Sequence, residues 1–293
     1  MLFSLLGIAL QLALAAVIIT YVLRLYEWRN LPASERLEDE ERLAPWLAGT
    51  LALLWEYFTS VAVILLYPIG WFMTGGKQAR GATDRPILFV PGFFGNEAAF
   101  LWLKHYLERR GHPTTYTVDL GPSRAGLKHF AALIADRVDE IRAETGAPKV
   151  DLICHGLGGL AARMYLAGGG AAHVATCVSI ATPHRGTKLA VLLAGKAARD
   201  MHPGSAAIAS LAAGIAAEQA AGVKFVNIYS SFDNWVLPPV QAELPGAENH
   251  VLHYLGHTAL FFSEQVGAIC TRAVSAVPAS KPTTNYSTEF PNG

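Results

Sequence analysis

Charged residues are scarce in this chain, and the two signs cancel. Asp, Glu, Lys and Arg make up only 16% of the 293 residues, with 23 basic and 23 acidic side chains. A nucleic-acid-binding surface needs a local excess of positive charge. We therefore expect no nucleic-acid partner.

Cysteine is equally sparse. Cys154, Cys177 and Cys270 are odd in number and lie in apolar or helical stretches. Their spacing matches neither a metal site nor a disulfide framework. We interpret all three as buried free thiols, and we expect neither a metal nor another cofactor.

Apolar residues are abundant, at 52% of the chain, and they are concentrated in the first 75 positions. Residues 2–22 are nearly all apolar, and a membrane helix needs about 20 such residues. No Lys or Arg precedes this run, which argues against a secretory signal peptide. A second apolar run, 46–73, carries aromatic residues near its ends, as membrane helices do at the bilayer interface. We predict a two-helix membrane anchor in residues 1–75.

Glu56 lies inside the second apolar run. An ionisable group at membrane depth is a functional candidate by default. The alternative is a structural role, near an interface or paired with a polar group of the first helix. Both interpretations stay open at the level of sequence.

The basic residues around the two runs favour one orientation. Arginines between the runs are Arg24, Arg29, Arg36 and Arg42, and basic residues after the second run are Lys77, Arg80 and Arg85. Because cytoplasmic loops carry the excess of Lys and Arg, the sequence favours a cytoplasmic connecting loop and a globular domain outside the cytoplasm. We expect a protein of the cytoplasmic (inner) membrane with two spans.

Residues 76–85 form a small, polar linker, and residues 86–275 alternate between strand-like and helix-like patterns. Strands are predicted at 86–90, 114–120, 149–154, 173–181, 223–229 and 251–255, and helices at 97–110, 126–145, 160–167 and from just after His257 to about 274. This alternation predicts an α/β domain with a mainly parallel central sheet and active residues at the carboxyl ends of its strands. The alanine-rich segment 188–222 fits either a cap over the site or a packing helix pair. The Pro-, Ser- and Thr-rich tail, 276–293, is predicted to be unstructured.

The most informative stretch is 150–163, where an apolar run enters a glycine-rich corner and a small-residue helix leaves it. This is the context of the nucleophile elbow, written G-x-S-x-G. Here the corner reads C-H-G-L-G, so Gly156 occupies the serine position. Cys154 is two residues away along the strand, and we do not interpret it as a substitute nucleophile.

An acid and a base follow the elbow in the order that this chemistry uses. Asp233 and His257 each come after a predicted strand. Asp233 would accept a hydrogen bond from imidazole Nδ1, and His257 would place Nε2 over the elbow. Of the other histidines, we expect His155 to pack sideways and keep His184 as a supporting candidate.

Two backbone N–H groups would form the oxyanion hole. One should come from Leu157, directly after Gly156, and the other from Phe93, in the loop after the first strand. Phe93 and Phe94 would also present apolar surface to an acyl chain.

Several segments together resemble the bacterial lipases and esterases of the α/β-hydrolase superfamily. The similar segments are V-P-G-F-F-G at 90–95, C-H-G-L-G-G-L-A-A-R at 154–163, A-T-P-H-R-G-T at 181–187, the loop around Asp233 and G-H-T-A-L-F-F-S at 256–263. The resemblance covers roughly residues 85–275 and implies an α/β-hydrolase fold and hydrolysis of lipid or other apolar carboxylic esters. The chain departs from the family at Cys154, where glycine is usual, at Pro91, where histidine often stands, and at Gly156, where the nucleophile is lost.

Gly156 allows three interpretations. In the first, the natural protein has serine here and this chain is a deliberately inactivated variant. Alternatively, the protein is a pseudo-hydrolase that binds a lipid or a protein at the membrane. A third route uses a water molecule activated by His257. Loss of selection for catalysis would also erode Asp233, His257 and the oxyanion glycine Gly92, yet all are present.

Overall fold

The structure is a computed structural model, and it describes residues 2–33, 36–37, 46–70, 85–93, 95–121, 124–220 and 222–275. Most of the predicted linker, the predicted tail and Phe94 lie outside the described residues.

A six-stranded sheet forms the centre of the globular part. Its strands are β1 (Ile87–Val90), β2 (Thr115–Thr117), β3 (Val150–His155), β4 (Val174–Ile180), β5 (Lys224–Ser230) and β6 (Glu248–Leu252), in the spatial order β2-β1-β3-β4-β5-β6. Every neighbouring pair is parallel, as the sequence predicts. The order reverses between β1 and β3, and ligands of open α/β sheets bind at the carboxyl ends of the strands at such a switch point.

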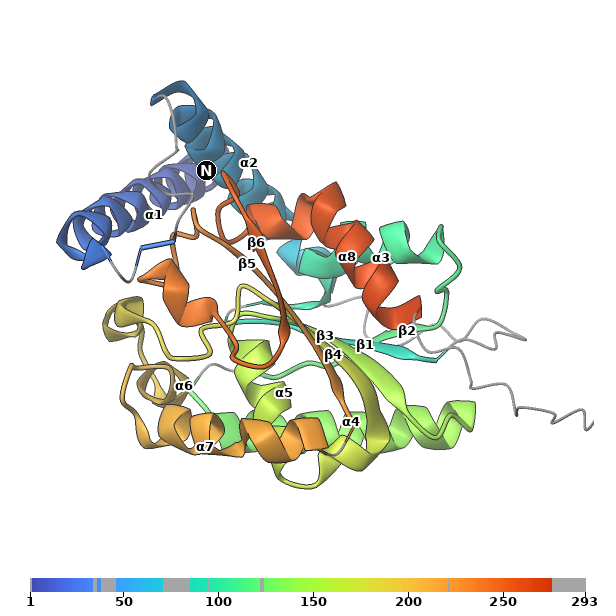
Figure 1. Cartoon of the computed structure of the whole chain (residues 1–293). Helices are drawn as coiled ribbons and strands as arrows, with labels where there is room; N and C mark the ends of the chain where they lie inside the picture. Colours follow the sequence, from blue (N-terminus) through green and yellow to red (C-terminus); the bar gives the residue numbers. More distant parts are fainter. Residues whose placement is uncertain are drawn as a thin grey trace, which may run out of the picture.

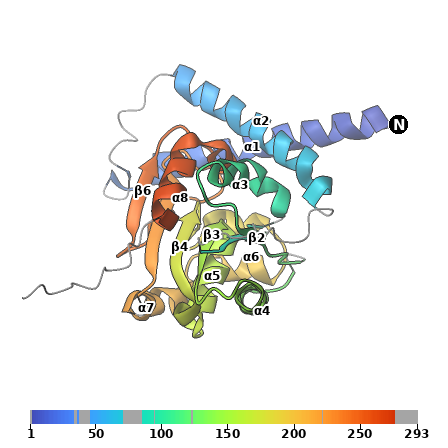
Figure 2. The same cartoon turned by 90° about the vertical axis from the view of Figure 1, so that its right-hand side faces the viewer.

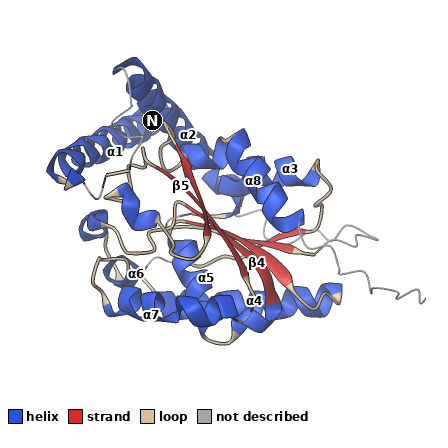
Figure 3. Ribbon diagram, viewed as in Figure 1, coloured by secondary structure: helices blue, strands red, loops and turns tan. Residues whose placement is uncertain are grey.

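Helices cover both faces of the sheet (Figures 1 and 3). On one face lie α3 (Leu101–Glu108) and α8 (Glu264–Ser275), and on the other α4 (Leu127–Thr145), α5 (Leu157–Ala167), α6 (Lys196–Asp200) and α7 (Ala206–Ala220). The pleat of β1 explains the two layers, because Ile87 and Phe89 pack in one apolar core while Leu88 and Val90 pack in the other. Short 3-10 helices are η3 (Glu97–Phe100), η4 (Gly170–His173), η5 (Lys188–Leu192), η6 (Pro239–Ala242) and η7 (Ala259–Phe262).

Two further helices, α1 (Leu2–Asn30) and α2 (Trp46–Gly70), pack against each other beside the globular part (Figure 2). Both are long and apolar enough to cross a membrane, over Leu10–Asn30 and Ala48–Gly70. Large apolar side chains such as Leu12 and Phe58 are exposed on them. One face of α2 packs against η3 and η7 of the globular part.

Several elements differ from the sequence predictions. β2 is only Thr115–Thr117 rather than 114–120, and α8 begins at Glu264, after the separate 3-10 helix η7. β6 is Glu248–Leu252 rather than 251–255. This strand lies at the edge of the sheet and its side chains are exposed or half-buried. The bounds of β6 are therefore set by its backbone pairing with β5, and its sequence carries no apolar pattern that marks them. Segment 188–222 folds into η5, α6 and α7, and α7 packs against α5. A capping role for this segment stays a prediction.

Candidate active site

Gly156 forms a sharp corner between β3 and α5. Its backbone angles are φ 51° and ψ −122°, a conformation that glycine adopts at little cost and other residues adopt only under strain. Its N–H donates to the carbonyl of Ile180 at 2.9 Å, which fixes the corner above the sheet. The chain therefore has a strand–turn–helix corner at the position where the sequence predicts the elbow.

A side chain at this corner would point toward His257. An ideal Cβ built on Gly156 would lie 3.5 Å from Nε2 of His257 and 3.8 Å from the Cα of Gly92. Both distances are ordinary van der Waals contacts. A small side chain thus fits, and a hydroxyl on it would come within reach of the imidazole.

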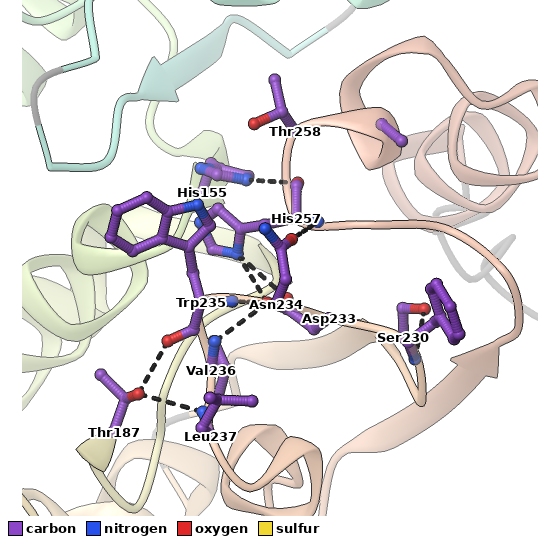
Figure 4. Close-up of polar contacts among 12 residues, drawn as sticks. His155, Thr187, Ser230, Asp233, Asn234, Trp235, Val236, Leu237, His257 and Thr258 are labelled. Carbon is purple, nitrogen blue, oxygen red and sulfur yellow. Dashed lines mark hydrogen bonds and ion pairs between the residues drawn. The ribbon is translucent and has the colours of Figure 1, made fainter. Parts of the chain in front are cut away.

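Asp233 and His257 are hydrogen-bonded to each other (Figure 4). Nδ1 of His257 lies 3.0 Å from Oδ2 and 3.2 Å from Oδ1 of Asp233. The Asp233 carboxylate is buried, and Oδ1 also accepts from the N–H groups of Trp235 and Val236 at 2.7 and 2.9 Å. Asn234 accepts from the backbone N–H of His257 at 3.1 Å. These bonds orient both the carboxylate and the imidazole.

The environment of His257 favours its protonated form. Burial of the ring lowers the pKa of His257, but the negative charge and hydrogen bond of Asp233, with the charge of Glu56, outweigh burial and raise it above 6.5. An imidazole that is stabilised when positive suits the role of a general base, because it becomes imidazolium after taking a proton.

His155 packs against His257 from the side. The centroid of its ring lies 4.5 Å from that of the His257 ring and 4.1 Å from that of the Phe261 ring. Its Nε2 is 3.3 Å from the His257 carbonyl oxygen. Burial, together with the charge of His257, holds the pKa of His155 well below 6.5. His155 is therefore a neutral packing partner of the His257 loop.

His184 lies in a different buried network. Its Nε2 is 3.1 Å from Oγ of Ser179 on β4 and 3.2 Å from Oδ1 of Asn227 on β5. Burial keeps the pKa of His184 well below 6.5. These two hydrogen bonds join His184 to β4 and β5, and they do not reach Asp233 or His257.

The two predicted oxyanion donors border the same corner. Leu157 begins α5, so its N–H is one of those that a helix leaves without an intrahelical acceptor. Phe93 follows Gly92, and an ideal Cβ on Gly92 would lie 3.1 Å from the His155 carbonyl oxygen. The loop after β1 therefore approaches the elbow closely enough that a larger residue would force a shift. Phe94 lies outside the described residues.

A cavity of about 840 Å³ opens beside the elbow. Gly92, Phe93 and Leu157 line it near Gly156, and Tyr67 and Gly70 of α2 line it at the other side. Further lining residues include Val118, Leu120, Phe130 and Leu133, which are apolar, and Glu97, Asp119, Arg124, Asp136, Arg137 and Glu140, which are charged. The cavity therefore extends from the loop after β1 to the end of α2.

Sequence reasoning did not identify Asn234, although it adjoins Asp233. No motif marks it, because its role depends on the meeting of two loops that are distant in sequence. Among the described residues, no group of three or more His, Cys, Asp or Glu side chains is arranged to hold a metal ion.

Comparison with known proteins agrees with this architecture. Residues 87–280 match the alpha/beta hydrolase family. Among solved structures, the mature form of a lipase from Bacillus licheniformis is similar, with a TM-score of 0.59 and 18% identity over 68% of this chain and 95% of that one. Lipase B of Aspergillus fumigatus gives a TM-score of 0.57 and 16% identity over 69% of this chain and 55% of that one. At these identities the likeness concerns the fold.

Proposed function

Because this chain belongs to the alpha/beta hydrolase family, we propose that it has the site of a membrane-anchored lipase or carboxylesterase, in a form that Gly156 leaves without its nucleophile. The observation that carries the proposal is the 3.5 Å between an ideal Cβ on Gly156 and Nε2 of His257. A serine at this position would place its hydroxyl beside a base that Asp233 already orients.

With a hydroxyl present, the reaction follows from the geometry. The serine oxygen attacks the ester carbonyl while Nε2 of His257 takes its proton, and the N–H groups of Phe93 and Leu157 stabilise the oxyanion. His257 then gives the proton to the departing alcohol, and water releases the acid from the acyl-enzyme. In the chain as it stands the first step has no attacking oxygen. Ester binding is retained, and acyl-enzyme turnover is lost.

The cavity supports an apolar substrate. Phe93, Val118 and Leu133 offer apolar walls for an acyl chain, and Tyr67 and Gly70 bring α2 to the same space. The exposed apolar side chains of α1 and α2 would be covered by the bilayer. A lipid or similar ester is therefore the substrate class. The distribution of Arg and Lys around the two apolar helices supports a globular domain on the outer side of the cytoplasmic membrane.

The alternative is a pseudo-hydrolase that binds a lipid or a protein partner at the membrane. Gly156 itself favours it, because the glycine removes the backbone strain that a nucleophile would impose at φ 51°. In this case the cavity would hold its ligand without turnover.

Hydrolysis by a Gly156→Ser variant tests the proposal, with p-nitrophenyl esters of graded chain length as substrates. We expect a gain on the order of 10⁴–10⁶ over the parent chain. Gly156→Ala is the matched control, since it adds the same strain, about 1–3 kcal/mol, without a hydroxyl. The double variant Gly156→Ser, His257→Ala should lose the gain.

The same experiment separates the three interpretations of Gly156. A folded Gly156→Ser variant without hydrolysis contradicts the hydrolase proposal and favours the binding protein. Parent-chain hydrolysis that disappears in His257→Ala would instead support water as the nucleophile.

A further inference from the structure

The two N-terminal helices contact both loops that carry the acid and the base. On α1, Oγ1 of Thr20 accepts from Nδ2 of Asn234 at 2.8 Å, and Asn234 in turn accepts from the N–H of His257. Arg24 donates to the carbonyl of Ser231 at 2.6 Å, two residues before Asp233. The helix pair is therefore joined to the site by polar contacts as well as by apolar packing.

Glu56 of α2 makes the most direct of these contacts. Its side chain is fully buried and accepts from the N–H of Thr258 at 3.0 and 3.1 Å and from the N–H of Ala259 at 2.8 Å. These two residues follow His257 directly. The carboxylate thus holds the backbone immediately after the base.

Gly256, on the other side of His257, lies against the same carboxylate. An ideal Cβ on Gly256 would lie 2.5 Å from Cδ of Glu56 and 2.6 Å from the hydroxyl oxygen of Tyr21. Only a residue without a side chain allows the loop to approach this closely. Residues 256–259 therefore wrap around the Glu56 carboxylate.

A buried carboxylate on an apolar helix is costly unless its hydrogen bonds are satisfied. Here the satisfying donors belong to the His257 loop, which is about 200 residues away in sequence. A purely structural helix contact would need no charged group at this point, because an apolar side chain serves elsewhere on this helix: Val63 is partly buried and packs against the apolar core.

We propose that Glu56 is a positioning residue, which sets the place of the His257 ring through the Thr258 and Ala259 amides and so makes the site depend on docking of the N-terminal helices. The helix α2 also contacts the segment that follows β1, because Nδ2 of Asn96 in that segment donates to the Tyr67 carbonyl of α2 at 2.7 Å. One helix thereby holds both the base loop and the loop that follows β1. A change in how α2 sits in the membrane is transmitted to both.

The test uses the full chain in lipid nanodiscs and needs no turnover. Glu56→Gln removes the charge and one strong acceptor, and Gly256→Ala pushes the intact carboxylate away from the loop. In both variants we expect the Nδ1 proton signal of His257 to be lost or broadened in NMR spectra, and amide exchange of residues 257–260 to rise about tenfold or more. Asp151→Asn is the control, because it makes the same carboxyl-to-amide change at a buried site at the far end of β3.

Titration of His257 gives a second readout. The groups that face it are Asp233, Glu56, His155 and, beside Gly256, the Tyr21 hydroxyl. Glu56→Gln should lower the pKa of His257, because it removes one of the charges that raise it. Gly256→Ala keeps this charge, so a change in the amide exchange of residues 257–260 in this variant reports only the position of the His257 loop.

The activity assay rests on the proposed function and is run in the Gly156→Ser background. We expect Glu56→Gln to lower kcat about tenfold to a hundredfold with little change in KM, since misplacement of a catalytic group costs about this much. Unchanged His257 signals and exchange rates in both folded variants would overturn the positioning proposal. Perturbed signals with no hydrolysis in the Gly156→Ser background would keep it and reject the hydrolase.

Discussion

The Oδ1 atom of Asp233 lies 3.2 Å from Nδ1 of His257 and at the same time accepts from two backbone N–H groups of its own loop. The bonds from its own loop orient the carboxylate independently of the imidazole, and Oδ2 of Asp233 lies 3.0 Å from Nδ1 of His257. Because the ring of His257 is largely buried, its charged form depends on this partner.

Asp233→Asn should therefore lower the pKa of His257 below its ordinary value, since burial would then act with less opposition. NMR titration of the His257 imidazole in the variant and in the parent chain measures this. In the Gly156→Ser background, the rate of ester hydrolysis should fall by a factor on the order of 10⁴. An unaltered His257 titration would contradict the assigned pair.

The same pair makes stability depend on pH. The folded-state pKa of His257 is raised above 6.5, so its contribution is present below about pH 6.5 and is lost as pH rises through the folded-state pKa. We expect Asp233→Asn to lower the thermal unfolding midpoint more at about pH 5 than at about pH 8. Equal losses at the two pH values would argue against this linkage.

Asp151 should give a pH dependence of its own. Burial raises its pKa from 3.8 to about 6, although Arg85, at 3.0 Å, acts in the opposite direction. The folded chain therefore binds this proton more tightly, and stability falls by about 3 kcal/mol as pH rises from about 3.8 to about 6. Asp151→Asn should remove this slope between about pH 4 and 7, as measured by denaturant unfolding at a series of pH values. An identical slope in the variant would show that Asp151 is not the group.

Gly158→Ala should destabilise the elbow. An ideal Cβ on Gly158 would lie 2.5 Å from the carbonyl oxygen of Val90 and still closer to that of Pro91. Both atoms belong to the backbone and cannot move aside easily, so we expect a loss of about 3 kcal/mol. Gly168→Ala is the control, because its nearest contacts are 3.4 Å and its φ is −79°. Thermal unfolding of the two variants measures the difference, and equal unfolding midpoints would contradict this prediction.

Leu133→Trp should shorten the cavity beside Phe93 and Leu157. A fluorescent long-chain fatty acid should bind about tenfold more weakly, which corresponds to the loss of two buried methylene groups. In the Gly156→Ser background the preferred ester should become shorter. Val191→Trp, an exposed residue outside this cavity, serves as the control. Equal binding by both variants would place the acyl chain elsewhere.

Much of the fold follows from local pattern. The buried strand β1 is a continuous apolar run, and β3 is an apolar run interrupted by Asp151 and closed by His155. The amphipathic helix α4, Leu127–Thr145, matches the predicted 126–145 to within one residue at both ends. The sequence pattern places the edge strand β6 three residues too late, because its side chains are largely exposed and its backbone pairing with β5 leaves no apolar pattern.

The sequence by itself determined the corner at Gly156, the order of Asp233 and His257 after it, and the presence of two apolar helices, because each is a local property of composition or spacing. Only the tertiary structure decided that Asp233 meets Nδ1 of His257, that Nε2 faces the glycine, and that Glu56 binds the amides after His257. These contacts join segments up to 203 residues apart. Their geometry depends on how the sheet and helices pack together, which no short stretch of sequence specifies.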